Sequence, residues 1–196
     1  MKLPALLIAT HNTGKVREIT PFFISFVDRI LSLQDVNVTV IAPETGTTYE
    51  ENAQSKAETY FRITGIPTLA DDSGIEVDAL NGQPGIYSAR FAGKNASDKD
   101  NNKKLLHLLT GIPAEKRTAR FRCIIALALP DGTHLFEGIT EGIIASSPAG
   151  GHGFGYDPVF IPDGYDKTFA ELGPAVKTQL SHRTRALKKT VDFLNK

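Results

Sequence analysis

The chain has 196 residues, of which 41% are hydrophobic, so it is long enough to bury a substantial core without disulfides or a structural metal. Its 22 basic and 22 acidic residues give a formal net charge of zero, which argues against a protein that coats nucleic acid or an anionic membrane. The single cysteine, Cys123, excludes an intramolecular disulfide and a zinc site built from cysteines. We therefore expect a cytoplasmic protein with neither nucleic acid nor membrane as a partner.

The N-terminal part of the chain predicts a strand, a helix and a second strand. Residues 5–9 form a continuous apolar run that ends in polar residues, as in a strand buried on both faces. A helix should follow with Thr13 as its cap, and Pro21 should kink or interrupt it. Alternating valines at 36–41 indicate another strand. No apolar run approaches the roughly 18 residues that a membrane-spanning helix requires.

The next segment predicts a well-capped helix and a short strand. Thr48 can accept a hydrogen bond from the backbone of Glu51, so a helix should run from there to about Gly65. Residues 68–70 should form a short strand. That strand would deliver a polar run at its end, where α/β proteins commonly place their chemistry. The run consists of Asp71, Asp72, Ser73 and Gly74.

The second half of the chain predicts a helix, a hairpin, a short strand and a final helix. Ser97 should cap the first helix and Gly111 should end it. The Pro130-Asp131-Gly132 turn should join two antiparallel strands, and Ser181 should cap the final helix. The strands are expected at 118–129, 133–145 and 159–161. The sheet would therefore be mixed, and the chain should be an α/β protein.

A polar loop between the first strand and the first helix is a candidate anion site. Its residues are Thr10, His11, Asn12, Thr13, Gly14 and Lys15. Backbone N–H groups at a helix N-terminus favour anions, and Lys15 adds a charge suited to phosphate. The loop is not a Walker A motif, which would require glycine in place of Ala9 and serine or threonine in place of Val16. An ordinary strand-to-helix turn with an exposed lysine is the alternative.

Acidic residues provide candidate ligands for Mg²⁺. This cation takes carboxylate oxygens and often only one or two of them, with water and substrate phosphates at its other positions. Asp72 and Glu44 fit that role. The adjacent pair Asp71 and Asp72 would repel unless a cation or hydrogen-bond donors compensated the charge, which favours a function. Glu51 is better explained by helix capping.

Two further segments could recognise a base and phosphates. In the loop Phe154, Gly155, Tyr156 and Asp157, aromatic rings could stack on a flat ligand while glycines allow close approach. Lys177, His182 and Arg183 form a donor cluster at and before the last helix, although a solvated basic helix end is the alternative. Together with the lysine loop and the carboxylates, these segments supply what a nucleoside triphosphate site needs.

The same segments, in this order, resemble the Ham1/RdgB family of inosine triphosphate pyrophosphatases, also called dITP/XTP pyrophosphatases. The resemblance covers nearly the whole chain. It is carried by ATHNTGK at 9–15, ETG at 44–46, ENA at 51–53, ADDSG at 70–74, PGIYSAR at 84–90, GFGYDP at 153–158 and SHR at 181–183. One departure lies before the last motif, where the family tends to have an acidic residue and an asparagine beside the lysine. This chain has Val176 and Thr178 there, after Gly173-Pro174.

The resemblance implies a reaction and residue roles. Non-canonical purine nucleoside triphosphates (ITP, dITP, XTP) would be hydrolysed to monophosphate and pyrophosphate, with Asp72 as proton acceptor and, with Glu44, as a ligand of Mg²⁺. Thr10 to Lys15 and Ser73 would contact phosphates. Base and phosphate recognition would fall to Phe154, Gly155, Tyr156, Asp157, Lys177, His182 and Arg183.

The resemblance also implies an architecture. It predicts one α/β domain, residues 1–196, with a long mixed sheet, flanking helices and two lobes around a central cleft, assembled as a homodimer. Two other readings stay open: a Maf-like nucleotide pyrophosphatase with a different base preference, and a non-catalytic nucleotide sensor.

Overall fold

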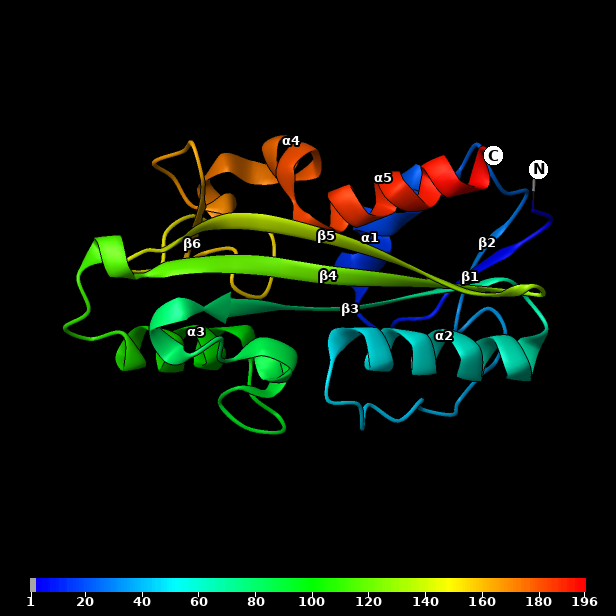
Figure 1. Cartoon of the computed structure of the whole chain (residues 1–196), viewed down its shortest axis with the longest axis horizontal. Coiled ribbons are helices and arrows are strands. Elements are labelled where there is room, and N and C mark those ends of the chain that lie inside the picture. Colours follow the sequence, from blue (N-terminus) through cyan, green and yellow to red (C-terminus); the bar gives the residue numbers. More distant parts are fainter. Residues whose placement is uncertain (1–2) are drawn as a thin grey trace. The chain divides into compact units, whose positions relative to one another are not determined.

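The computed structural model describes residues 3–196 and has mixed α/β architecture (Figure 1). Six strands form one sheet in the order β2-β1-β3-β4-β5-β6. The strands are β1 (Leu6–Ile8), β2 (Ile30–Ser32), β3 (Thr68–Val77), β4 (Thr118–Leu129), β5 (Gly132–Ile144) and β6 (Phe160–Pro162). The α-helices are α1 (Thr13–Phe23), α2 (Tyr49–Thr64), α3 (Asp98–Leu108), α4 (Phe169–Leu180) and α5 (His182–Leu194). Strand β1 is parallel to β2 and β3, whereas β5 and β6 are antiparallel, so the expected mixed sheet is confirmed.

The chain divides into two compact units. Unit 1 contains Met1–Asp72, Cys123–Gly138 and Arg183–Lys196, and unit 2 contains Ser73–Arg122 and Ile139–His182. Strands β3, β4 and β5 therefore contribute residues to both units. No helix within residues 3–196 is long and apolar enough to cross a membrane.

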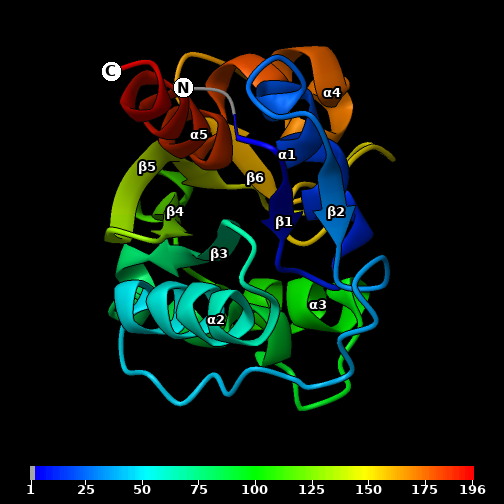
Figure 2. The same cartoon turned by 90° about the vertical axis from the view of Figure 1, so that its right-hand side faces the viewer.

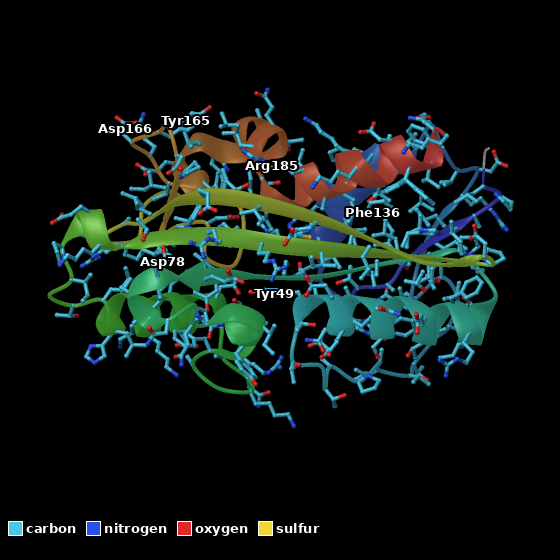
Figure 3. All side chains as sticks on the ribbon, in the orientation of Figure 1. Tyr49, Asp78, Phe136, Tyr165, Asp166 and Arg185 are labelled. Carbon is cyan, nitrogen blue, oxygen red and sulfur yellow. The ribbon has the colours of Figure 1, made fainter. Side chains whose placement is uncertain are left out.

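The core of unit 1 forms around β1, which is buried along its whole length. Helices α1 and α5 lie on one side of the first three strands and α2 on the other (Figures 1 and 2). Ile19 and Phe23 of α1 and Leu187 of α5 are fully buried in this core. Phe136 of β5, labelled in Figure 3, packs against Phe193 of α5 with ring centroids 5.5 Å apart. Each large apolar side chain buried in this way contributes about 1.5–3 kcal/mol.

The core of unit 2 is rich in aromatic rings. Phe121 and Phe160 have ring centroids 4.6 Å apart, and Phe169 of α4 lies 5.5 Å from Phe160. Leu105 of α3 and Leu109, the residue that follows this helix, are fully buried in the same cluster. Helices α3 and α4 lie on opposite sides of the strands of this unit (Figure 1).

Capping explains most of the helix boundaries. Thr48 caps α2 by accepting from the Glu51 amide, and Gly65 ends the helix with φ of 68°. Ser97 caps α3, as predicted, although this helix ends at Leu108 rather than at Gly111. At α1 the cap is Asn12 and not Thr13.

The N-terminus of α1 differs from the prediction because of a stronger acceptor. Asn12 Oδ1 accepts from the amides of Gly14 and Lys15, at 2.9 and 3.1 Å, and one carbonyl oxygen thereby satisfies two free N–H groups of the first turn. Thr13 becomes the first helical residue. The helix then continues through Pro21 and ends at Phe23, so the proline does not interrupt it.

The predicted strand at 36–41 is wrong. The second strand is β2, which pairs with β1 through residues 30–32. Asn37 has φ of 52°, which turns the chain, and the following Val40 and Ile41 are 53% and 78% exposed. Alternating valines indicated a strand, but the turn removes them from any pairing partner.

Strand β3 is longer than predicted, and α4 was not predicted. The strand continues through 71–74 to Val77, so Asp71 and Asp72 lie within it rather than after its end. Helix α4 contains Gly173, whose φ of 78° and ψ of 178° are not helical, followed by Pro174. These two residues hide the helical pattern in the sequence. The hairpin of β4 and β5 and helix α5 agree with prediction, and β6 is shifted by one residue.

Candidate functional site

One group of predicted site residues lies in unit 1 and is centred on Asp71, whose side chain is completely buried. Lys15 Nζ lies 2.9 Å from Asp71 Oδ2, so the lysine of the predicted anion loop points to this carboxylate. Arg183 donates to the same oxygen from Nε at 3.3 Å and from Nη2 at 3.1 Å. A second hydrogen bond partner of Arg183 is the carboxylate of Glu18 on α1.

These charges determine the protonation of Asp71 and Arg183. Burial alone would raise the pKa of Asp71, but the positive charges of Lys15, Arg183 and Lys56 outweigh it and hold the pKa well below its usual range. Burial would lower the pKa of Arg183, yet Asp71 and Glu18 raise it above its usual value. Both groups are therefore charged at neutral pH. Because Asp71 and Arg183 are both enclosed, removing either charge would leave the other compensated only in part, by Lys15 for Asp71 and by Glu18 for Arg183.

The neighbouring carboxylate, Asp72, has a different environment. Its Oδ2 accepts from Asn52 Nδ2 at 3.2 Å, and its Oδ1 lies 3.5 Å from Lys56 Nζ. The side chain is 13% exposed, whereas that of Asp71 is fully enclosed. Burial raises the pKa of Asp72; the positive charges of Lys56 and Lys15 oppose this shift, the nearby carboxylates of Glu44 and Asp71 add to it, and the net direction is upward. A carboxylate with a raised pKa and a polar, partly open environment is suited to accept a proton.

Lys56 on α2 is a residue that the sequence reasoning missed. Its Nζ donates to Glu44 Oε1 at 2.9 Å and to the backbone carbonyl of Asp71 at 2.8 Å. Burial would lower its pKa, but the carboxylates of Asp72, Asp71 and Glu44 raise it. The signal for this residue was its position on the helix, since Lys56 lies four residues from both Asn52 and Tyr60, which are buried on the inner face of α2.

Asn52 connects the carboxylates to the preceding loop. While its Nδ2 donates to Asp72, its Oδ1 accepts from the Gly46 amide at 2.9 Å. A Cβ at position 46 would lie 2.7 Å from that oxygen, so glycine allows this close approach. The side chain of Asn52 thereby fixes both the orientation of Asp72 and the position of the loop that carries Glu44.

The oxygens around Lys56 match the preferences of a hard divalent cation. Glu44, Asp72 and the Asp71 carbonyl already surround one positive charge, the ammonium group. Within residues 3–196 no group of three or more His, Cys, Asp or Glu side chains could hold a metal by itself. Two carboxylates agree with Mg²⁺, which takes few protein ligands and completes its shell with water and substrate phosphates.

A separate group of predicted site residues lies in unit 2, in the loop at 153–157. Asp157 Oδ2 accepts from the Phe154 amide at 2.8 Å and from Lys177 Nζ at 2.6 Å. Lys177 Nζ also lies 4.4 Å from the centre of the Phe154 ring, a cation–π contact. Gly153 has φ of 81°, and a Cβ there would lie 2.0 Å from the Asp157 carboxylate. The loop conformation therefore requires glycine at this position.

The two remaining aromatic groups of the predicted site are packed in the core. Tyr156 is 5% exposed and donates from its hydroxyl to the carbonyl oxygen of Ser88 at 2.8 Å. His182 stacks on Phe121 with ring centroids 4.7 Å apart and 9° between the ring planes. Phe154 is thus the aromatic ring of the loop that lies outside the apolar core cluster of unit 2.

The structure therefore assembles the predicted residues within each unit. Unit 1 brings together Lys15, Glu44, Asp71, Asp72 and Arg183, to which it adds Asn52 and Lys56. Unit 2 brings together Phe154, Asp157 and Lys177. Thr10 and His11 precede Asn12, the N-cap of α1, Thr13 and Gly14 are the first two residues of that helix, and Ser73 follows Asp72 on β3.

Known proteins contain the same arrangement of segments. Residues 6–193 match the Ham1 family model. The chain belongs to the Ham1 family. A protein of Geobacter sulfurreducens named dITP/XTP pyrophosphatase is 50% identical over 190 residues, which cover 96% of each chain. A Bacillus subtilis protein of the same name is 47% identical over 189 residues, again 96% of each.

Solved Ham1 structures agree with this assignment. The Staphylococcus aureus Ham1 protein superimposes with a TM-score of 0.88 at 41% identity, covering 97% of this chain and 98% of the other. A HAM1 protein from Coxiella burnetii gives the same TM-score at 38% identity and covers 100% of this chain and 99% of its own. The α/β fold and the family predicted from the sequence are both confirmed.

Proposed function

We propose that this chain is a nucleoside triphosphate pyrophosphatase that acts on non-canonical purine nucleotides, namely ITP, dITP and XTP. The products would be the nucleoside monophosphate and pyrophosphate. The observation that carries the proposal is the pair of adjacent carboxylates in unit 1. Asp71 forms ion pairs with Lys15 and Arg183, whereas the pKa of Asp72 is raised above its usual value, which suits a general base. The names of the Ham1 relatives support the substrate class.

In the proposed mechanism, water attacks the α-phosphorus and Asp72 accepts a proton from it at a carboxylate oxygen. A bond forms between the water oxygen and the α-phosphorus, and the bond from that phosphorus to the bridging oxygen of pyrophosphate breaks. Asn52 holds Asp72 Oδ2 and so directs the other oxygen, Oδ1, toward the region of Lys56. Positioning and charge stabilisation account for most of the catalysis of phosphoryl transfer.

Lysines and a divalent cation would stabilise the negative charge. Lys15 and Lys56 lie beside Asp71 and Asp72, so their ammonium groups can bind phosphate oxygens. Thr10 to Gly14 and Ser73 belong to the same proposed phosphate site, and Arg183 adds charge next to Asp71. Glu44 and Asp72 would hold Mg²⁺, which when bound supplies positive charge to the triphosphate.

The loop at 153–157 is the proposed purine site. The Phe154 ring offers a face for stacking, Gly155 allows close approach, and Lys177 lies beside both Phe154 and Asp157. We include Tyr156, His182 and Arg183 in the base and phosphate site. Selectivity for 6-oxopurines would follow from donors placed for the 6-oxygen, since the 6-amino group of ATP would leave such donors unpaired.

We also propose that residues 1–196 act as one enzyme domain and that the protein is a cytoplasmic homodimer. The resemblance to the Ham1/RdgB family supports the dimer, and the single buried cysteine agrees with a reducing compartment. Gel filtration with light scattering tests the dimer, since a mass equal to one chain would exclude it.

The proposed function is tested by measuring pyrophosphate release from ITP, dITP, XTP, GTP and ATP, with Mg²⁺ and with a chelator. We expect multiple turnovers with the first three substrates, lost when the metal is removed. Equal activity on all five would contradict the proposed selectivity and return the function to the Maf-like alternative, and binding without turnover would favour a nucleotide sensor.

A further inference from the structure

Two side chains from the first turns of α3 bind the backbone of Gly155. Asp98 Oδ2 accepts from the Gly155 amide at 2.6 Å, and Asn102 Nδ2 donates to the Gly155 carbonyl oxygen at 3.0 Å. Asp98 and Asn102 are four residues apart and therefore project from the same face of the helix. The Gly155 N–H belongs to the peptide group shared with Phe154 and the Gly155 C=O to the peptide group shared with Tyr156, so one helix fixes the orientation of both peptide groups.

The stability of unit 2 does not explain why residue 102 is an asparagine. It is 5% exposed, and its Oδ1 has no hydrogen-bond partner among residues 3–196. The Gly155 carbonyl fixes the orientation of the Asn102 side-chain amide, because the flipped orientation would place Asn102 Oδ1 against the Gly155 carbonyl oxygen. A buried acceptor without a partner destabilises a fold, whereas leucine would fill the same space without that penalty. The hydrogen bond to Gly155 is therefore what this asparagine provides.

The rest of the loop is anchored by other contacts. Asp157 binds the Phe154 amide, and the hydroxyl of Tyr156 binds the Ser88 carbonyl. Gly155 has φ of 62° and no atom within 4 Å of where its Cβ would lie, so contacts to its backbone are what restrain it. Helix α3 supplies those contacts at the residue next to Phe154.

We propose that Asp98 and Asn102 are positioning residues for purine binding. By fixing the peptide groups on both sides of Gly155 they set the plane of the adjacent Phe154 ring, against which the base would stack. This inference rests on the proposed function, in which the loop at 153–157 encloses the base. If the contact stabilises bound substrate and transition state equally, its loss should raise KM and leave kcat unchanged.

Asp100 is a matched control on the same helix. It is also an aspartate of the first turn, but its carboxylate accepts hydrogen bonds from the backbone and side chain of Ser97, with which it forms the capping box of α3. Asp98→Ala and Asp100→Ala each remove one negative charge from the N-terminus of α3. The two variants differ in whether Gly155 loses a partner.

The kinetic test compares Asp98→Ala, Asn102→Leu and Asp100→Ala with ITP as substrate. For the first two variants we expect KM to rise roughly three- to tenfold, the scale of one lost hydrogen bond, while kcat stays within about twofold of wild type. Asp98→Asn keeps an acceptor oxygen and should restore most of the wild-type KM. Asp100→Ala should leave KM unchanged. The proposal is refuted if Asp98→Ala and Asn102→Leu keep the wild-type KM or change kinetics as Asp100→Ala does.

Amide hydrogen exchange of Gly155, measured by NMR, tests the same contact without any activity. Exchange should be slow in the wild type and in Asp100→Ala, and fast in Asp98→Ala. If the wild type releases no pyrophosphate, the proposed function fails while this measurement still reports on the contact. Equal exchange rates in Asp98→Ala and the wild type would overturn the proposal even in a fully active enzyme.

Discussion

Substituting the two adjacent aspartates one at a time should separate stability from catalysis. Asp71→Asn removes the carboxylate that both Lys15 and Arg183 bind, in a position with no exposed side-chain surface. Asp72→Asn removes a carboxylate that is 13% exposed and that lies near two other negative groups, Glu44 and Asp71. The first change should destabilise the fold, and the second should stop the reaction.

The magnitude for Asp71→Asn follows from what remains around Arg183. Breaking a buried ion pair by removing one partner typically costs about 3–5 kcal/mol. Arg183 keeps its contact with Glu18, and the Lys15 side chain is 16% exposed, so water can compensate part of its charge. We therefore expect a loss of about 2–4 kcal/mol in the free energy of unfolding. In a chain of this size, that loss lowers Tm by roughly 4–16 °C.

Asp72→Asn should change stability by less than about 1 kcal/mol, because Lys56 retains Glu44 and the Asp71 carbonyl while repulsion between carboxylates is relieved. Urea unfolding at pH 7, followed by circular dichroism, measures both variants, with the exposed Asp163→Asn as a control. Equal losses of stability for Asp71→Asn and Asp72→Asn would refute the assignment of distinct roles to the two carboxylates.

Three further outcomes are expected. Burial raises the pKa of the Cys123 thiol to about 12, so the native protein at pH 8 should resist iodoacetamide until urea unfolds it, and rapid native alkylation would contradict this. Gly153→Ala should raise KM for ITP, because its Cβ would meet the Asp157 carboxylate, whereas Gly151→Ala, where the space is open, should behave as wild type. Asn52→Leu should lower kcat about tenfold, the equivalent of one buried hydrogen bond, and an unchanged kcat would remove its positioning role.

Local sequence signals predicted much of the fold. Thr48 and Ser97 cap their helices through the backbone contacts that their residue types favour, and Pro130-Asp131-Gly132 joins two long strands. Such features depend on interactions between residues close in sequence. The failure at 36–41 has the opposite origin, because which segment pairs with β1 is decided by the tertiary fold, and a single turn at Asn37 overrides the valine pattern.

Some residues of the candidate site could be predicted from local sequence, and others depend on the tertiary fold. Lys15, Glu44 and Asp72 could be named from their residue types and from the motifs around them. Lys56 could not, because its role depends on α2 packing so that its ammonium group meets three oxygens from distant segments. The sequence also could not predict that Asp71 and Asp72 have different roles. Both are aspartates, and they differ only in which cations the fold places beside each carboxylate.

Turnover of ITP in ¹⁸O-labelled water tests whether water attacks the α-phosphorus with Asp72 as the base. We predict that ¹⁸O appears in the monophosphate and not in pyrophosphate, and that Asp72→Asn lowers the rate of labelling by about 10² or more. Label in pyrophosphate, or near-wild-type turnover by Asp72→Asn, would contradict the account.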